Sequence, residues 1–261
     1  MKPHIKDKLK ELRYNTHKVQ LTTGRLKEVP HQLKICTSIK YLDLFGNSIH
    51  EIPDWFFQFK YLEHLSLKNN ALKVFPSIVF TIENLKCLNL ADNQIHEINS
   101  HYFRNLMSIE KVDISYNQIS SIPTEIIEYP KCNSLSIKGN KLQKFPTAVS
   151  DCYTLEKLDL SENKINLIED DAFDLLENLI ELDLSFNELT YLPTSIGKLK
   201  KLKRLNLSGN KIRSLPKEFE NLTSLEFLDF DNNPIGRVPV EISSQGVSGI
   251  INYYLSLGDN V

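Results

Sequence analysis

Apolar residues follow a short repeating phrase along most of the chain, in which two leucine-like residues alternate with polar ones before an asparagine. In the segment 61–83, Leu65 and Leu67 precede Asn70 in this way, and Leu72 and Phe75 follow it. Alternation with a period of two is typical of a short strand that buries one face. We therefore predict a strand around Leu65, a turn at Asn70 and an irregular return segment.

The asparagine recurs with nearly constant spacing, about 23 residues, which indicates a solenoid of stacked units. The positions are Asn47, Asn70, Asn93, Asn117, Asn140, Asn163, Asn187, Asn210 and Asn233. A buried amide offers two donors and an acceptor, so we predict that these residues form a structural ladder that satisfies backbone groups between neighbouring units. Gly24 takes the aligned position in a first unit, which brings the expected total to about ten units.

Proline follows most of these asparagines at a fixed distance, as Pro76 and Pro146 do, and predicts an extended backbone in an irregular return segment. Two units lack this proline, contain one extra residue and carry Phe103 or Phe173. In these two units we expect a short helical turn, with the phenylalanine filling the wider space.

The full phrase, Leu-x-x-Leu-x-Leu-x-x-Asn-x-Leu-x-x-Leu-Pro, resembles the leucine-rich repeat family over Val19 to Ile242. The resemblance implies an α/β fold: a right-handed, horseshoe-shaped solenoid with a parallel β-sheet on the concave face and irregular or short helical segments on the convex face. Both ends of a solenoid need caps. We expect an N-terminal cap helix in residues 1–18, the solenoid in 19–242 and a C-terminal cap helix in 243–261. This ending resembles that of intracellular, Ras-group-type members of the family.

Composition and charge favour a protein that acts away from membranes and nucleic acid. Of its 261 residues 41% are hydrophobic, and the formal net charge is −2, so the basic excess that nucleic-acid binding requires is missing. No apolar run is long enough to span a bilayer, and residues 1–18 do not resemble a signal peptide. The four cysteines are scattered, whereas secreted members of the family cluster theirs in disulfide-bonded caps: Cys36, Cys87, Cys132 and Cys152. We expect a cytoplasmic monomer; export from a bacterium without a visible signal peptide is the alternative.

No pattern of residues indicates catalysis, a metal ion or a cofactor. His50 and His96 share a repeat position but lie two units apart, too far to bind one metal ion. An acidic row in the predicted strands could suggest acid–base catalysis or a calcium site, but the resemblance implies a structural role in the Leu-Asp-Leu-Ser phrase. The row consists of Asp43, Asp113, Asp159, Asp183 and Asp229. We expect no enzymatic activity and no cofactor.

Departures from the small residues that are usual on the concave face mark candidate contact points for a partner. Near the N-terminal end these are Tyr41, Phe45, His64, Lys68 and Lys111, with Cys87 between them. Exposed aromatic residues flanked by cations are typical of interface hot spots. A partner with acidic groups around an apolar anchor would suit this surface; in the alternative reading the two aromatic residues cover the N-terminal cap.

A second candidate surface near the C-terminal end combines Glu181, Arg204, Phe227 and Asp231, although its charges are also consistent with pairing across strands. We expect the basic run 198–204 to be a solvated edge. Tyr116 and Phe186 directly precede a ladder asparagine, where they either edge the concave face or cover the turn.

The sequence therefore predicts a non-catalytic module that binds another protein through the concave face, as a scaffold or regulator in signalling. The alternative is a secreted or surface-acting bacterial recognition factor that binds a host protein or carbohydrate. A self-associating structural protein is a third possibility.

Overall fold

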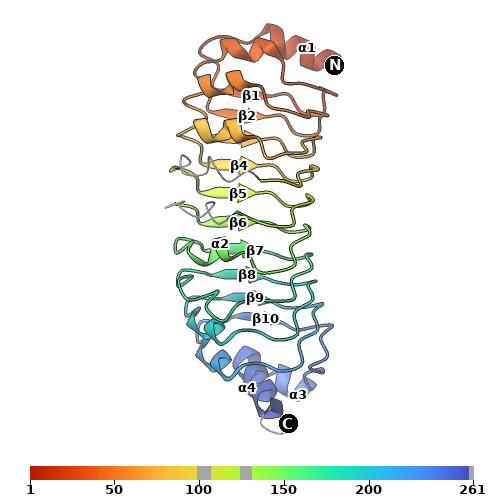
Figure 1. Ribbon diagram of the computed structural model, residues 1–261, viewed down its shortest axis with the longest axis vertical. Coiled ribbons are helices and arrows are strands. Elements are labelled where there is room, and N and C mark those ends of the chain that lie inside the picture. The colour runs from red at the N-terminus through yellow and green to blue at the C-terminus, as the bar shows by residue number, and fades with distance from the viewer. Residues whose placement is uncertain (99–106, 124–130, 259–261) are drawn as a thin grey trace. The chain divides into compact units, whose positions relative to one another are not determined.

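The computed structural model describes residues 1–98, 107–123 and 131–258; Phe103 and its expected turn lie outside this part of the chain. The chain divides into two compact units, Met1–Cys132 and Asn133–Val261. Each unit is a stack of coils in which a short strand is followed by a return segment (Figure 1).

The first unit begins with helix α1 (Pro3–Lys10) and continues with parallel strands paired in chain order. The strands are β1 (Lys18–Gln20), β2 (Tyr41–Asp43), β3 (His64–Ser66), β4 (Cys87–Asn89) and β5 (Lys111–Asp113). The return segments carry the 3-10 helices η1 (His31–Ile35), η2 (Asp54–Gln58) and η3 (Ser77–Thr81).

The second unit repeats this arrangement and ends in two helices. Its parallel strands are β6 (Ser134–Ser136), β7 (Lys157–Asp159), β8 (Glu181–Asp183), β9 (Arg204–Asn206) and β10 (Phe227–Asp229). Its return segments carry α2 (Thr147–Ser150), η6 (Thr194–Lys198) and η7 (Lys217–Asn221). The terminal helices are α3 (Val240–Ser243) and α4 (Gly246–Gly258).

The core is built from the positions that the repeating phrase marks as apolar. Leu65 at the centre of β3 is 2% exposed, and Leu67 just after the strand is fully buried. Leu72 and Phe75 on the far side of the turn are buried against the same interior. Burial of such side chains is the main favourable contribution to the stability of each coil. The leucine-rich repeat solenoid predicted from the sequence is confirmed.

The return segments differ from the prediction, because the helical turns follow the prolines. In η3 the extended backbone of Pro76 (φ −73°, ψ 95°) precedes the helix, and the Val79 N–H donates to the Pro76 carbonyl at 3.0 Å. Proline suits the start of a helix because a backbone N–H there has no acceptor within the helix, and proline has no N–H to leave unpaired. The segment around Phe173, where a helical turn was expected, forms successive turns instead. Phe173 is nonetheless fully buried, and its ring packs edge-on against Phe145 at 5.4 Å.

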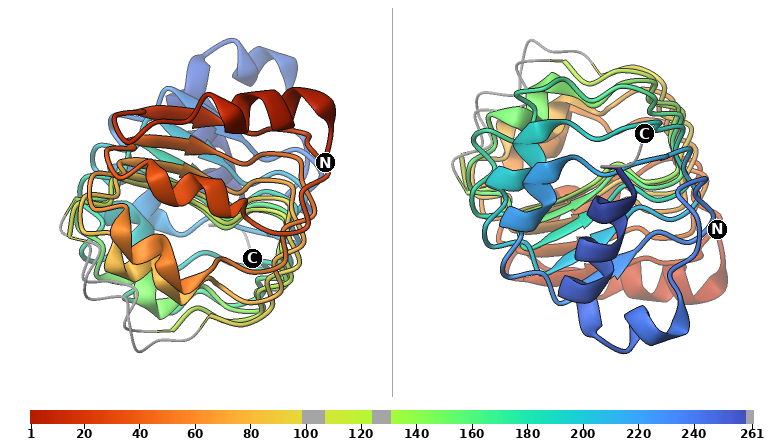
Figure 2. Two further views of the ribbon diagram at one scale, coloured as in Figure 1. Left: turned by 90° about the horizontal axis from the view of Figure 1, so that it is seen from above. Right: turned by 90° about the horizontal axis from the view of Figure 1, so that it is seen from below.

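Helices cover the apolar interior at the first and the last coil (Figure 2). In unit 1, α1 buries Ile5 and Leu9, and the Lys8 ammonium donates to the carbonyl of Gln20 in β1 at 2.9 Å. In unit 2, α4 buries Ile251 and Tyr254, and the Tyr254 ring lies 5.4 Å from that of Phe230. Helix α1 lies within residues 1–18 and α4 within residues 243–261, whereas α3 begins at Val240, before the predicted boundary.

Candidate functional site

Each asparagine of the predicted ladder lies at the turn after a strand and bonds to backbone groups of its own coil, and those that follow another coil of the same unit also bond to that preceding coil. Asn70 is 9% exposed; its Oδ1 accepts the Ile49 N–H at 3.0 Å, and its Nδ2 donates to the carbonyls of Leu44 and Leu67 at 3.0 and 2.9 Å. At the first coil, Asn47 Oδ1 accepts the N–H of Gly24, and a Cβ atom on Gly24 would lie 2.7 Å from Ile5 of α1. The amides therefore connect neighbouring coils and hold their turns in register.

The residue before each described ladder asparagine has a positive φ angle, and two of these residues are aromatic. Tyr116 (φ 51°) and Phe186 (φ 52°) are 43% and 56% exposed. The Phe186 ring packs over Gly209, where a Cβ atom would lie 2.7 Å from its Cδ1. The left-handed backbone directs these rings outward over the turns rather than into the core.

The side chains of the first and last residue of each strand point away from the core. The side chain two positions after the strand also points away from the core. We call this surface of each unit the strand face. In β2 and β3 the central leucine is buried and its neighbours are half-buried. Short strands on a rigid stack of coils therefore hold these side chains in fixed rows.

The acidic row has a structural role on this face, because each carboxylate accepts a hydrogen bond from the backbone N–H two residues further on. Asp113 Oδ1 accepts the N–H of Ser115 at 3.0 Å and its hydroxyl at 2.6 Å. Asn206 makes the equivalent bonds to Ser208 in β9, so a charge is not needed for them. Burial raises the pKa of the Asp159 carboxyl; hydrogen bonds from Ser161 lower it, and neighbouring Asp183 raises it further.

We call Tyr41, Phe45, His64, Lys68 and Lys111 the N-terminal patch, and its members lie together on the strand face of unit 1. Strand register places Tyr41 beside His64, with ring centroids 5.9 Å apart, and places His64 and Lys111 on either side of Cys87.

The two aromatic residues of the N-terminal patch are half-buried, which differs from the expectation that they are exposed. The Lys18 ammonium lies 4.8 Å from the centre of the Tyr41 ring, which accounts for part of its burial. Lys68 forms an ion pair with Asp92 at 3.3 Å. Burial raises the pKa of the Cys87 thiol, so this residue stays in the less reactive protonated form.

We call Glu181, Arg204 and Phe227 the C-terminal patch, and they occupy adjacent positions on the strand face of unit 2. The Arg204 guanidinium lies 4.4 Å from the centre of the Phe227 ring, a cation–π arrangement. Although Glu181 is aligned with Arg204, its ion pair is with Lys157 on the other side, at 2.7 Å. The pairing across strands that the sequence suggested therefore involves a different cation.

The C-terminal patch borders a shallow hollow of about 410 Å³ on the strand face of unit 2. Its floor and walls come from β6 to β10 and include Ser134, Lys157 and Asp159 as well as the patch itself. The sequence analysis did not include Ser134 and Lys157 in the site. Their repeat position, identical to that of Glu181 and Arg204, is the signal that could have found them.

The basic run 198–204 is engaged with neighbouring coils. Lys198 pairs with Asp174 at 2.9 Å, and Lys203 pairs with Glu226 at 2.9 Å. Lys201 donates to Asn178 at 2.7 Å. Carboxylates therefore offset the charges of Lys198 and Lys203, whereas Lys201 bonds to a neutral amide.

The described residues contain no group of three or more His, Cys, Asp and Glu side chains that could hold a metal ion. Within the same ranges, no helix combines the length and apolar character needed to cross a membrane. All four cysteines are free thiols.

Comparison with known proteins places these observations in a family. A family model described as "Leucine rich repeat" matches residues 83–142, 130–189 and 181–235, which together exceed half of the chain, and a second one matches residues 38–59. A solved structure of a Leptospira interrogans LRR protein superimposes with a TM-score of 0.80 at 31% identity, covering 88% of this chain and 57% of that one.

Curated relatives match shorter segments. Leucine-rich repeat serine/threonine-protein kinase 1 of Caenorhabditis elegans is 34% identical over 94 residues, which are 35% of this chain and 4% of the kinase. Lumican of Coturnix japonica is 29% identical over 181 residues, or 66% of this chain and 43% of lumican. The chain thus spans less than half the length of either relative. The family models, the solved structure and the ladder agree, and the chain belongs to the leucine-rich repeat family.

Proposed function

We propose that this chain is a non-catalytic module that binds another protein through its strand face, with the C-terminal patch as the principal contact. The observation that carries the proposal is the Arg204–Phe227 pair at the border of the hollow in unit 2. Arginine and large aromatic residues are the side chains most often found at binding hot spots. Proteins of this family generally act in protein–protein interaction, which agrees with the proposal.

The C-terminal patch is rigid and only partly covered, which suits recognition of a folded surface. Phe227 is 38% exposed, and the leucine beneath Arg204 is fully buried in the core, so little ordering is needed on binding. Arg204 makes no ion pair with a described residue, so its charge is available to a carboxylate of the partner. An apolar side chain seated in the hollow beside an acidic residue would complement this surface.

The N-terminal patch is proposed as a secondary contact. Asp92 offsets the charge of Lys68, and the half-buried aromatic rings expose less area than Phe227 does. His64 and Lys111 remain as its accessible polar groups, and Lys111 forms no ion pair within the described ranges.

The wider setting of the proposal is a cytoplasmic, monomeric scaffold or regulator in signalling that binds neither nucleic acid nor a cofactor. The net charge of −2 supports the exclusion of nucleic acid. The four free thiols suit a reducing compartment. Similarity to a leucine-rich repeat kinase and to an adenylate cyclase of Schizosaccharomyces pombe supports a signalling context.

A second candidate function is a surface-acting bacterial recognition factor for a host protein or carbohydrate. It is favoured by the match to the Leptospira interrogans protein, which extends over 88% of this chain. In this case Phe227 would serve as a stacking platform for a sugar ring. Binding on a glycan array that is lost in Phe227→Ala would establish this function.

Affinity capture from lysate of the native source tests the leading proposal with three proteins: the wild type, Arg204→Ala/Phe227→Ala, and Lys217→Ala/Tyr153→Ala. The last variant removes an exposed cation and an exposed aromatic residue from the return segments, away from the strand face. We expect a defined protein to be retained at least ~10-fold less by the strand-face variant than by the other two proteins. Equal retention by all three would refute the C-terminal patch, and equal loss in both variants would refute the strand face as the specific contact.

A further inference from the structure

The last strand of unit 2 leaves a row of backbone groups without partners among the described residues. Just after β9, the N–H groups of Leu207 and Gly209 donate to the carbonyls of Asp229 and Asp231, both at 2.8 Å. The groups in the equivalent positions one coil later are the N–H groups of Phe230 and Asn232, which form no hydrogen bond with any described residue. We call this row of backbone groups, residues 226–232, the β10 edge.

At the first strand of unit 1, helix α1 occupies part of the corresponding edge. The Gln20 carbonyl of this strand, equivalent to the Asp43 carbonyl that accepts the Leu21 N–H, is occupied by the Lys8 ammonium at 2.9 Å. The Lys2 N–H also donates to the Gly24 carbonyl at 3.1 Å. Helix α1 therefore supplies polar groups to the edge that it covers, whereas α3 and α4 leave the β10 edge open.

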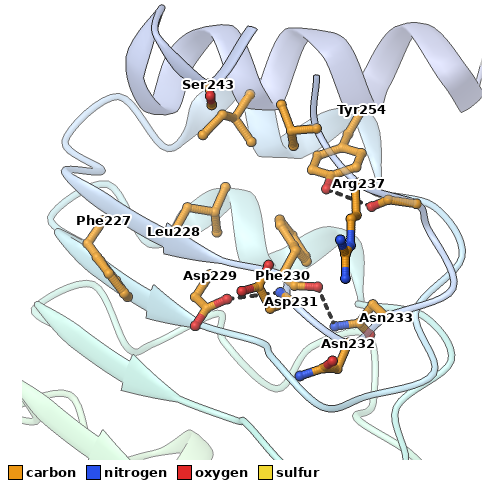
Figure 3. A pocket seen from close by; sticks show the side chains of 13 residues that line it. Phe227, Leu228, Asp229, Phe230, Asp231, Asn232, Asn233, Arg237, Ser243 and Tyr254 are labelled. Atoms are coloured by element: carbon orange, nitrogen blue, oxygen red, sulfur yellow. Dashed lines mark hydrogen bonds between the residues drawn. The ribbon is translucent and has the colours of Figure 1, made fainter. Parts of the chain in front are cut away.

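A groove of about 800 Å³ separates the β10 edge from the terminal helices (Figure 3). Its lower side is residues 227–233, and its upper side is formed by Ser243, Ile250 and Tyr254. The volume lies within the range of pockets that hold whole ligands and exceeds what one side chain fills. Leu228, at the centre of β10, is half-buried, whereas the equivalent leucine of β9 is fully buried. The groove thus combines an unpaired strand edge with an incompletely covered core residue.

We infer that the β10 edge binds an extended peptide segment of a partner protein, which adds to the sheet of unit 2 as a parallel strand. Exposed strand edges are recognised in this way, with main-chain hydrogen bonds providing affinity and alternate side chains providing specificity. One set of side chains on the added strand would fill the groove against Leu228 and Ile250. The other set would extend the strand face beside Asp229 and Asp231.

The charged residues that line the groove determine which peptide segment binds there. Asp229, Asp231 and Arg237 line the groove, and none of them forms an ion pair with a described residue. The two carboxylates lie in or just after β10 on the strand-face side, whereas Arg237 follows in the return segment. The segment therefore carries apolar residues at alternate positions and lysine or arginine opposite these two carboxylates. Phe227 borders both this groove and the C-terminal patch, but the inference relies on backbone groups of the β10 edge rather than on the Arg204–Phe227 pair.

A peptide that copies residues 203–209 of the chain, with Asn206→Lys, provides the probe. In the protein this segment pairs with β8, where the Arg204 N–H donates to the Ile180 carbonyl and the Leu184 N–H donates to the Asn206 carbonyl. On the β10 edge, the same register places the new lysine opposite Asp229. Fluorescence polarisation of the labelled peptide with the full chain measures its affinity.

Two N-methylated peptides of identical composition test the backbone contacts. Methyl groups on the backbone nitrogens of peptide positions 204 and 206 block the N–H groups that face the edge, whereas methyl groups on those of positions 205 and 207 block the N–H groups that point away. We expect the first peptide to bind at least ~10-fold more weakly than the second. Equal affinities, or no measurable binding of the unmodified peptide at millimolar protein, would overturn the inference.

Protein variants locate the site. Ile250→Trp narrows the groove and should weaken peptide binding at least ~10-fold, whereas Val240→Trp, at an 80% exposed position of α3 outside the groove, should leave it unchanged. If Ile250→Trp lowers the melting temperature, Asp229→Asn is the second groove variant. Asp229→Asn should weaken binding of the Asn206→Lys peptide but not of an Asn206→Glu peptide. Unchanged binding by both groove variants would contradict the assignment. A dimer in sedimentation that Ile250→Trp abolishes would assign the edge to a second copy of the chain and overturn the partner peptide.

Discussion

Replacing Asn187 by alanine tests the energetic role of the ladder at a single interior position. Asn187 is 6% exposed; its Oδ1 accepts the Ile165 N–H at 2.9 Å, and its Nδ2 donates to the carbonyls of Leu160 and Leu184 at 3.0 and 3.1 Å. Alanine removes all of these bonds and adds no replacement donor or acceptor.

Of the backbone groups that bond to the Asn187 side chain, some lose their only hydrogen-bond partner in the alanine variant and others keep a second one. The Ile165 N–H has no other acceptor, so it becomes an unsatisfied buried donor. The Leu160 and Leu184 carbonyls keep their bonds from Asn163 and Asn210. One orphaned donor costs about 1–3 kcal/mol, and each lost second bond to a carbonyl adds about 0.5–1 kcal/mol. We therefore expect the free energy of unfolding to fall by about 2–5 kcal/mol.

Asn178→Ala provides the matched control, because Asn178 is only half-buried; its Nδ2 donates to the Tyr153 carbonyl at 2.8 Å, and its Oδ1 accepts from the Lys201 ammonium at 2.7 Å. We expect this loss to cost less than ~0.5 kcal/mol. Urea denaturation followed by circular dichroism, with the m-value checked in each variant, measures both costs. Because repeat proteins can unfold in stages, hydrogen exchange at the Ile165 amide provides a second readout.

Asn187→Asp separates the donor function from the acceptor function. Aspartate can still accept the Ile165 N–H, but its carboxylate faces two carbonyls without a proton to donate. We expect it to be at least as destabilising as alanine near neutral pH and to recover stability as the pH falls and the carboxyl gains a donor. A cost for Asn187→Ala equal to that of Asn178→Ala would refute the reasoning.

Three further predictions concern the turns and the charged groups. Gly209→Ala should lower the melting temperature and cost ~1 kcal/mol or more, because φ is +67° and the added Cβ would lie 2.7 Å from Phe186; an unchanged melting curve would contradict this. Asp159→Asn should raise stability near neutral pH by less than ~1 kcal/mol. Because burial raises the folded pKa of the Asp159 carboxyl, the wild type loses stability as the pH rises through that pKa, and urea titrations should show the two proteins converging in acid. Hydrogen bonds from Lys86 and Lys40 lower the pKa of Glu63, so the wild type should lose stability relative to Glu63→Gln as the pH falls through the folded pKa; parallel pH profiles would exclude this contribution.

The sequence predicts the core and the strands because both follow the repeat period. The phrase around Asn70 identifies Leu65, Leu67 and Leu72 as buried, and all three are. The return segments are less predictable, because proline is compatible both with an extended segment and with the start of a 3-10 helix. The choice depends on packing between coils, as in η3, whose Val79 and Phe80 are buried.

The repeat pattern predicts the candidate surfaces only in part. The strand face follows from alternation, but the burial of Tyr41 depends on its contacts with Lys18 and His64 in the neighbouring coils. The hollow and the groove above β10 arise from the way strands and terminal helices pack together. No local sequence pattern encodes these cavities.

Photo-crosslinking from the strand face tests the central claim of protein binding most directly. A photoreactive phenylalanine analogue replaces Phe227 in one protein and Tyr153 in another; Tyr153 is 57% exposed on a return segment of the same unit. After irradiation in lysate of the native source, we expect a defined crosslinked protein from position 227 and none from position 153. The absence of a crosslink at 227, or equal crosslinks at both positions, would contradict the account.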